Sequence, residues 1–195
     1  MLPTLNFVSA LAAVVFFFLP WTSIECRGER MATQTGLQVI SGSAKVDDST
    51  DPVRMEIEAS GEVSLGRSYF AAAALLCAVS AVVMALAGAT RGRRDLSGAS
   101  GALCAIALTC LITQAAMGFP AKETLVRRIS EGPSGEPAGS PLEVLGKEIS
   151  REVVDRIQVH PMFWFYLELA ALGIPTVILL NRLLDRMRIS SERRG

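Results

Sequence analysis

The chain has 195 residues, half of them hydrophobic, and its 19 basic residues balance its 19 acidic ones, so no global charge indicates a nucleic-acid partner. The apolar residues are concentrated in four blocks, which leaves no segment long enough to bury the core of an ordinary enzyme domain. With a mean hydropathy of +0.38, this composition predicts a multi-pass membrane protein.

The first apolar block, residues 1–21, is expected to be a transmembrane helix that ends near Pro20 and Trp21. Aromatic residues favour the headgroup level of a membrane, and proline suits the edge of a helix. A secretory signal peptide is disfavoured, because no basic residue precedes the block and no small-residue cleavage site follows it. Lipidation of Cys26 is disfavoured as well, because Glu25 stands where such sites have a small residue.

The first polar loop, residues 22–68, is predicted to contain a short antiparallel sheet. Apolar and charged residues alternate at 53–57, which is the period-two pattern of a half-buried strand, and 37–40 is expected to be its partner or a neighbouring strand. The connector at 47–52 carries three aspartates. It lacks the spacing, the central glycine and the terminal glutamate of a calcium loop, so we expect a solvated turn there.

Two further apolar blocks, 69–89 and 99–119, are joined by the short link 90–98 and predict a membrane hairpin. About twenty residues at about 1.5 Å each cross a hydrocarbon core of roughly 30 Å. The link carries three arginines against one aspartate, which favours the cytoplasmic side. Small residues at four-residue steps predict a close-packing face on the second helix. These residues are Gly101, Ala105, Thr109 and Thr113.

The second polar loop, residues 120–160, is predicted to end in an amphipathic helix at 141–158. Ser140, Pro141 and Glu143 have the form of a capping box, which starts a helix. We expect the apolar face of this helix to pack within the chain, to bind a partner, or to lie on the outer leaflet. The residues of this possible partner face are Leu142, Leu145, Ile149, Val153 and Ile157.

The last block, 161–181, is the fourth predicted span and is followed by a basic tail at 182–195. The link and the tail together carry 8 basic and 3 acidic residues, whereas the two longer loops carry 11 and 15. By the positive-inside tendency, both termini are expected in the cytoplasm, with the protein in the plasma membrane.

Glu168 is an acidic residue inside the fourth span, roughly 9 Å from its outer end at about 1.5 Å per residue. Gln114 and Thr113 lie at a similar depth in the third span. These three residues form a possible intramembrane polar site for a proton or cation. The alternative interpretation is structural, with Glu168 and Gln114 joined by an interhelical hydrogen bond, or with Glu168 protonated or reaching the surface.

No other residues indicate chemistry. Cys77 and Cys110 share a depth in the hairpin, but cysteine is also a common small apolar residue, so we expect packing. His160 is the single histidine and cannot assemble a typical metal site alone. The sequence contains no zinc-protease motif, nucleophile elbow or phosphate-binding loop. We therefore expect neither an enzyme nor a cofactor.

The predicted layout of four spans, inner termini and a sheet-like first loop resembles the claudin and peripheral-myelin type of topology. That family has a Gly-Leu-Trp segment and two cysteines in the first loop, whereas this loop has only Cys26. The resemblance therefore concerns layout and implies no residue roles.

The predicted fold class is an all-α membrane protein, a four-transmembrane-helix bundle with a small extracytoplasmic module built from a loop 1 sheet and a loop 2 helix. The expected function is that of an interaction or scaffold subunit, which contacts membrane lipids and binds a protein partner or a second copy. The alternative is a transporter or channel component that uses Glu168 and Gln114.

Overall fold

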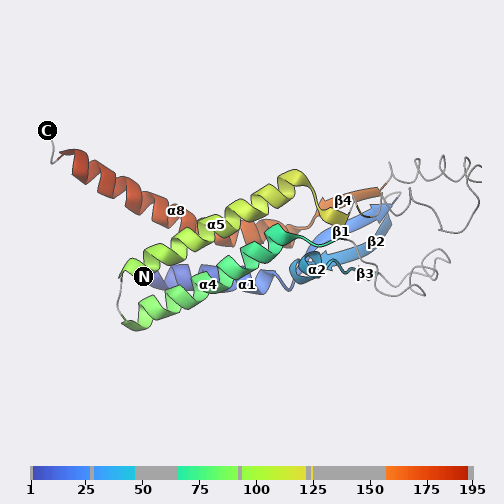
Figure 1. Ribbon diagram of the computed structural model, residues 1–195, viewed down its shortest axis with the longest axis horizontal. Helices are drawn as coiled ribbons and strands as arrows, with labels where there is room; N and C mark the ends of the chain where they lie inside the picture. The colour runs from blue at the N-terminus through green and yellow to red at the C-terminus, as the bar shows by residue number, and fades with distance from the viewer. Residues whose placement is uncertain are drawn as a thin grey trace, which may run out of the picture. The chain divides into compact units, whose positions relative to one another are not determined.

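The computed structural model in Figure 1 describes residues 2–26, 29–46, 66–91, 94–121, 124 and 157–192. Its described part is mostly helical and divides into two compact units. The helical unit contains α1 (Leu2–Phe16), α4 (Tyr69–Arg91), α5 (Arg94–Met117) and α8 (Phe163–Glu192). The loop unit contains β1 (Pro20–Cys26), β2 (Glu29–Thr35), α2 (Gly36–Ser41), β3 (Lys45–Val46) and β4 (Ile157–Pro161).

Three helices in the described part of the chain, α4, α5 and α8, are long and apolar enough to cross a membrane. This finding is compatible with a membrane protein. The helix α1 is also apolar but has only 15 residues, which is about 22 Å at 1.5 Å per residue. It is shorter than a hydrocarbon core of roughly 30 Å, so its length alone does not make it a span.

The helix α1 ends at Phe16, five residues before the predicted end of the first span at Trp21. Two backbone hydrogen bonds of 3.0 Å close its end, from the Phe18 N–H to the Val15 carbonyl and from the Leu19 N–H to the Phe16 carbonyl. These i to i−3 bonds tighten the chain into a turn, and Pro20 then begins β1. The apolar character of 17–21 therefore belongs to a turn and a strand.

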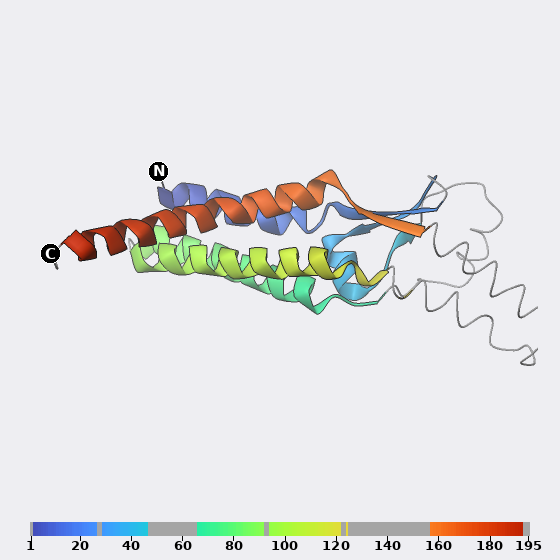
Figure 2. The same ribbon diagram turned by 90° about the horizontal axis from the view of Figure 1, so that it is seen from above.

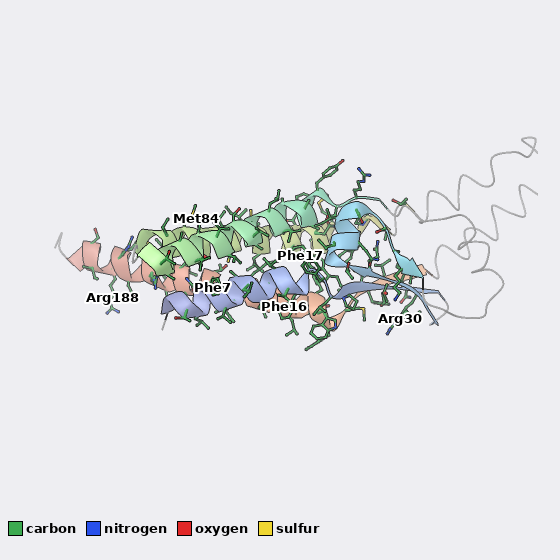
Figure 3. All side chains as sticks on the ribbon, turned by 90° about the horizontal axis from the view of Figure 1, so that it is seen from below. Phe7, Phe16, Phe17, Arg30, Met84 and Arg188 are labelled. Atoms are coloured by element: carbon green, nitrogen blue, oxygen red, sulfur yellow. The ribbon has the colours of Figure 1, made fainter. Side chains whose placement is uncertain are left out.

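The helix α8 is much longer than the predicted fourth span and continues through most of the predicted tail to Glu192. The segment after residue 181 contains leucine, arginine and methionine, which are good helix formers, and no glycine or proline interrupts it before Gly195. Figure 2 shows that this end of α8 runs past the ends of the other three helices. Arg188 lies on this extension, in its last turns (Figure 3).

The helical unit is held together by faces of small side chains. The helix α1 packs against both α4 and α8, and at one end the rings of Phe16 and Trp164 lie 6.3 Å apart. The buried face of α4 consists of alanines at three- and four-residue steps, which lets neighbouring backbones approach closely. These residues are Ala71, Ala74, Ala78, Ala81 and Ala85. On the outer side of α4, Met84 is exposed (Figure 3).

The packing face of α5 differs from the predicted one. Gly101 is buried as expected, but Thr109 is exposed, and the other buried residues lie along a different line of the helix. That line contains Ser100, Cys104, Ala107, Leu111 and Gln114. The hydroxyls of Thr109 and Thr113 each donate a 2.9 Å hydrogen bond to the carbonyl four residues earlier in their own helix. A threonine whose hydroxyl is bonded within its own helix does not need a neighbouring helix. The small size of the residues alone therefore predicted the wrong packing face of α5.

The loop unit is built around a four-stranded antiparallel sheet in the order β3-β2-β1-β4. The strand β1 is central and pairs with β2 on one side and with β4, from the second loop, on the other. A small antiparallel sheet in this part of the chain was predicted, but from other residues. The predicted strand at 53–57 lies outside the described residues, and the sequence did not assign strands to Trp21–Cys26 or to β4.

The predicted strand at 37–40 is wrong, because these residues lie in the helix α2. Thr35 caps this helix: its hydroxyl accepts a hydrogen bond from the Gln38 N–H at 3.2 Å, and the Gln38 side chain accepts one from the Thr35 N–H at 2.9 Å. Gly42 ends it in the left-handed region with a φ of 80°. A capping box and a terminal glycine thus override the strand preference of Val39 and Ile40.

The predicted amphipathic helix at 141–158 is wrong at its end, because Ile157 and Gln158 lie in the strand β4. Ile157 is paired with Cys26, so its backbone belongs to the sheet. The rest of the predicted helix lies outside the described residues. Isoleucine at the end of a helical pattern is equally suited to a strand, and pairing with β1 decides between the two.

We predict that Gly101 is needed for the contact between α5 and α8. A Cβ atom at this position would lie 3.0 Å from the Cβ of Leu179 and 3.2 Å from the carbonyl oxygen of Pro175, both fixed to the backbone. Gly101→Val should therefore destabilise the folded protein by about 1–3 kcal/mol, through overpacking. Gly98→Val is the matched control, since a Cβ at Gly98 meets nothing within 4 Å. Thermal unfolding in detergent, followed by circular dichroism, should show the difference; equal stability of the two variants would contradict it.

We also predict that cysteines at positions 25 and 158 form a disulfide, because Glu25 and Gln158 are directly paired across β1 and β4. Paired residues project to the same face of a sheet at a separation that suits a disulfide. The test uses Glu25→Cys with Gln158→Cys in a Cys26→Ser background, with peptide mapping by mass spectrometry after mild oxidation. The control pair, Glu25→Cys with Val159→Cys, places the thiols on opposite faces. Equal cross-linking of both pairs would show that the register is different.

Candidate functional site

The candidate site lies in the interior of the helical unit, at Glu168. The inward face of α8 carries Phe165, Glu168, Leu172 and Pro175 at three- and four-residue steps, and all four are buried. The side chain of Glu168 is 0 % exposed. Glu168 is the only buried acidic residue among the residues that the structure describes.

The carboxyl group of Glu168 has no hydrogen-bond partner within the described structure, at either Oε1 or Oε2. Transfer of an ionised carboxylate from water to such a position costs on the order of several kcal/mol, even after the protein relaxes. A neutral carboxylic acid costs much less, because only a polar group and not a charge loses its water. The site therefore suits an uncharged carboxyl group.

Gln114 shares the interior with Glu168. It is 5 % exposed and lies on the inward face of α5, three residues before the helix ends at Met117. Glu168 lies five residues after α8 begins at Phe163. At about 1.5 Å per residue, the two residues lie about 5 Å and 8 Å from the ends of their helices that lead into the loops.

The hydrogen bond between Glu168 and Gln114, one of the structural alternatives, is nevertheless not formed, since both carboxyl oxygens lack a partner among the described residues. A common depth fixes only the position of two residues along their helices, and not the direction of their side chains. Thr113 is half-buried, and its hydroxyl is bonded to its own helix at Thr109. Of the three predicted site residues, Glu168 and Gln114 are thus buried in one unit, while Thr113 makes its hydrogen bond elsewhere.

A second polar cluster joins three helices at the other end of the helical unit. The Ser97 hydroxyl on α5 accepts hydrogen bonds of 3.3 Å from the side chains of Asn6 on α1 and Arg182 on α8. The Oδ1 atom of Asn6 is buried and, in the described structure, has no partner. Sequence reasoning missed this cluster, although an asparagine in an apolar block signals a helix contact.

The thiols of Cys77, Cys104 and Cys110 are free, and Cys104 is buried. No group of three or more histidine, cysteine, aspartate or glutamate residues that could hold a metal ion occurs in the described part of the chain. The acidic connector at 47–52 lies outside the described residues, so its predicted solvated turn stays a prediction.

The loop unit carries a polar strip on one face of its sheet. Ser23 is paired with His160, and Glu25 with Gln158, so the four side chains share that face. Gln158 and His160 are exposed, and their side chains lie 2.9 Å apart at Oε1 and Nε2, while the Ser23 hydroxyl donates to Glu25 at 3.2 Å. The sequence alone did not indicate this strip, because β1 and β4 are more than a hundred residues apart in the chain.

Of the predicted partner face, Ile157 lies in β4, and the other four residues lie outside the described part of the chain. No protein-family model matches the chain, and no curated protein is similar to it.

Proposed function

We propose that the protein is a non-enzymatic, multi-pass membrane protein that acts as an interaction or scaffold subunit, with its loop unit as the binding part. The single observation that supports this function is the pairing of β4 with β1, which joins the two loops in one sheet. Loops that only connect helices do not need such pairing, whereas a shared sheet holds side chains in fixed positions.

The backbone of the loop unit is also held by buried apolar side chains and by long-range hydrogen bonds. Trp21 is 0 % exposed and Val39 is 1 % exposed, and Ile24 is buried as well. Two backbone hydrogen bonds fix segments that are distant in the sequence, from the Met162 N–H to the Trp21 carbonyl and from the Ser68 N–H to the Val39 carbonyl. Gln158 and His160 are therefore exposed side chains on a fixed backbone, as a protein partner or a second copy would require.

For the membrane arrangement, we propose that α1 is a fourth span and that both termini are cytoplasmic, in the plasma membrane. The helix α1 packs along α4 and α8, which are both able to cross a membrane. Both chain ends lie at the same end of the helical unit, the end at which α4 is followed by α5 (Figure 1). The excess of arginine in the link and in the tail supports the cytoplasmic side for this end.

A transporter or channel component, with Glu168 and Gln114 as its polar site, is the alternative function. A translocation path needs polar groups along its length. In the described helical unit, Gln114 and Glu168 lie toward the loop end, whereas Asn6 and Ser97 lie toward the other end. Buried residues such as Ala107 and Leu172 lie between these positions along their helices. We therefore favour a binding function of the loop unit over a transport function of the helical unit.

The proposed orientation predicts that tags at both ends of the chain are protected in sealed cells. If α1 does not cross the membrane, the three remaining spans place the N-terminus opposite to the C-terminus. The measurement is antibody binding to an N-terminal tag and, separately, to a tag after Gly195, before and after permeabilisation. Four spans require that both tags bind antibody only after permeabilisation. An N-terminal tag that is accessible in intact cells would show that α1 lies on the outer side.

The proposed function predicts that photo-cross-linkers at Gln158 and His160 capture the same protein in native membranes. Both side chains are exposed, so a probe there reaches a partner without disturbing the core. The matched control is a probe at Val39, which is 1 % exposed and should give no cross-link to another chain. Mass spectrometry then identifies the captured chain as a second copy or as a different protein. The binding function is wrong if Gln158 and His160 yield only links within the chain.

A further inference from the structure

We propose that Glu168 is a proton-binding site in the interior of the helical unit, and that the folded protein holds a neutral carboxylic acid there at neutral pH. This inference goes beyond the binding function of the loop unit and does not depend on it. The site takes up one proton, which forms the O–H bond of the carboxyl group, and no other reactant is needed.

The first argument is the isolation of the carboxyl group. Its side chain is 0 % exposed, and neither oxygen has a hydrogen-bond partner in the described structure. The nearest buried residues on the same face of α8 are Phe165, one turn earlier, and Ala171 and Leu172, one turn later, and all three are apolar. Among these apolar side chains, no hydrogen bond from the described residues would compensate the charge of a carboxylate.

The second argument is the lack of a positive charge near the site. The described part of α1 contains no charged or titratable residue, and the titratable side chains inside the apolar stretches of α4 and α5 are the thiols of Cys77, Cys104 and Cys110. The phenols of Tyr69, at the start of α4, and Tyr166, on α8, are exposed and carry no positive charge. On α8, the nearest basic residue is Arg182, fourteen residues away, which is about 21 Å along the helix. It is bonded to Ser97 in the cluster at the other end of the unit. No ion pair within the described unit therefore stabilises a carboxylate at Glu168.

The third argument distinguishes a proton from a metal ion. A hard cation such as Ca²⁺ needs six to eight oxygen ligands, and a transition metal needs several histidine, cysteine or carboxylate ligands. The described residues provide no such group of three. A single carboxyl group is, however, sufficient for a proton.

The test is infrared spectroscopy of the full-length protein in lipid vesicles. A protonated carboxyl group has a C=O stretching band that is separate from the bands of carboxylates and amides, and it shifts in D₂O. We expect this band in the wild-type protein from pH 6 to pH 8, and its loss in Glu168→Gln. Glu25→Gln is the matched control: this half-buried carboxyl accepts a hydrogen bond from Ser23, and its removal should leave the band unchanged.

Two further measurements keep the result decisive. Glu168→Leu removes the unpartnered group altogether and should also lose the band, so it replaces Glu168→Gln if that variant does not fold. Circular dichroism checks the helix content of each variant. If neither variant folds, the wild-type spectrum decides alone, because a protein without the protonated band at pH 7 overturns the proposal. A band that survives in a folded Glu168→Gln protein overturns it as well.

Discussion

The fold depends on how closely α1, α4, α5 and α8 approach one another, and small side chains set this distance. Five alanines make up the buried face of α4, and at Gly101 the backbone of α5 comes so near to α8 that a single Cβ atom would crowd Leu179 and Pro175. In lipid, apolar surface alone does not hold helices together, because the surrounding chains are equally apolar. Close contact over a long face provides the attraction instead.

The loop unit is stabilised in a different way, through the backbone of β1. This strand has a partner on both sides, β2 from the same loop and β4 from a distant one. Its central position means that every residue from Thr22 to Cys26 is fixed by two neighbours. The side chains that make up the polar strip therefore come from a rigid part of the loops, and the strip exists only when both loops are in place.

The long apolar helices α4 and α5 were predicted well from the sequence and the sheet poorly, and the reason is physical. The apolar stretches at 69–89 and 99–119 carry their own signal, because a membrane requires about twenty uncharged residues in one run. The strands β1 and β4 have no such signal, since the energy that selects them comes from pairing between segments that are far apart. The helix α2 was missed for another reason: the Thr35 to Gln38 capping box was present in the sequence, but the branched side chains of Val39 and Ile40 suggested a strand.

For the candidate site, the sequence predicted how far Glu168 lies from the end of its helix. It could not predict that the carboxyl group lacks a hydrogen-bond partner, because this depends on side-chain directions that only the packed structure fixes.

Two side chains with buried, unpartnered polar atoms, Asn6 and Glu168, lie at opposite ends of the described helical unit, and their chemistry separates their roles. At Asn6 the amide nitrogen still bonds to Ser97, and the unpartnered Oδ1 atom is part of a neutral group, so the cost is that of one lost hydrogen bond, about 1–3 kcal/mol. At Glu168 both oxygens lack partners, and the group can carry a full charge. An asparagine can be retained for helix contact alone, because its remaining hydrogen bond offsets part of the cost. A glutamate that makes no hydrogen bond contributes nothing to packing that glutamine or leucine would not provide, so its carboxyl chemistry is the property that distinguishes it.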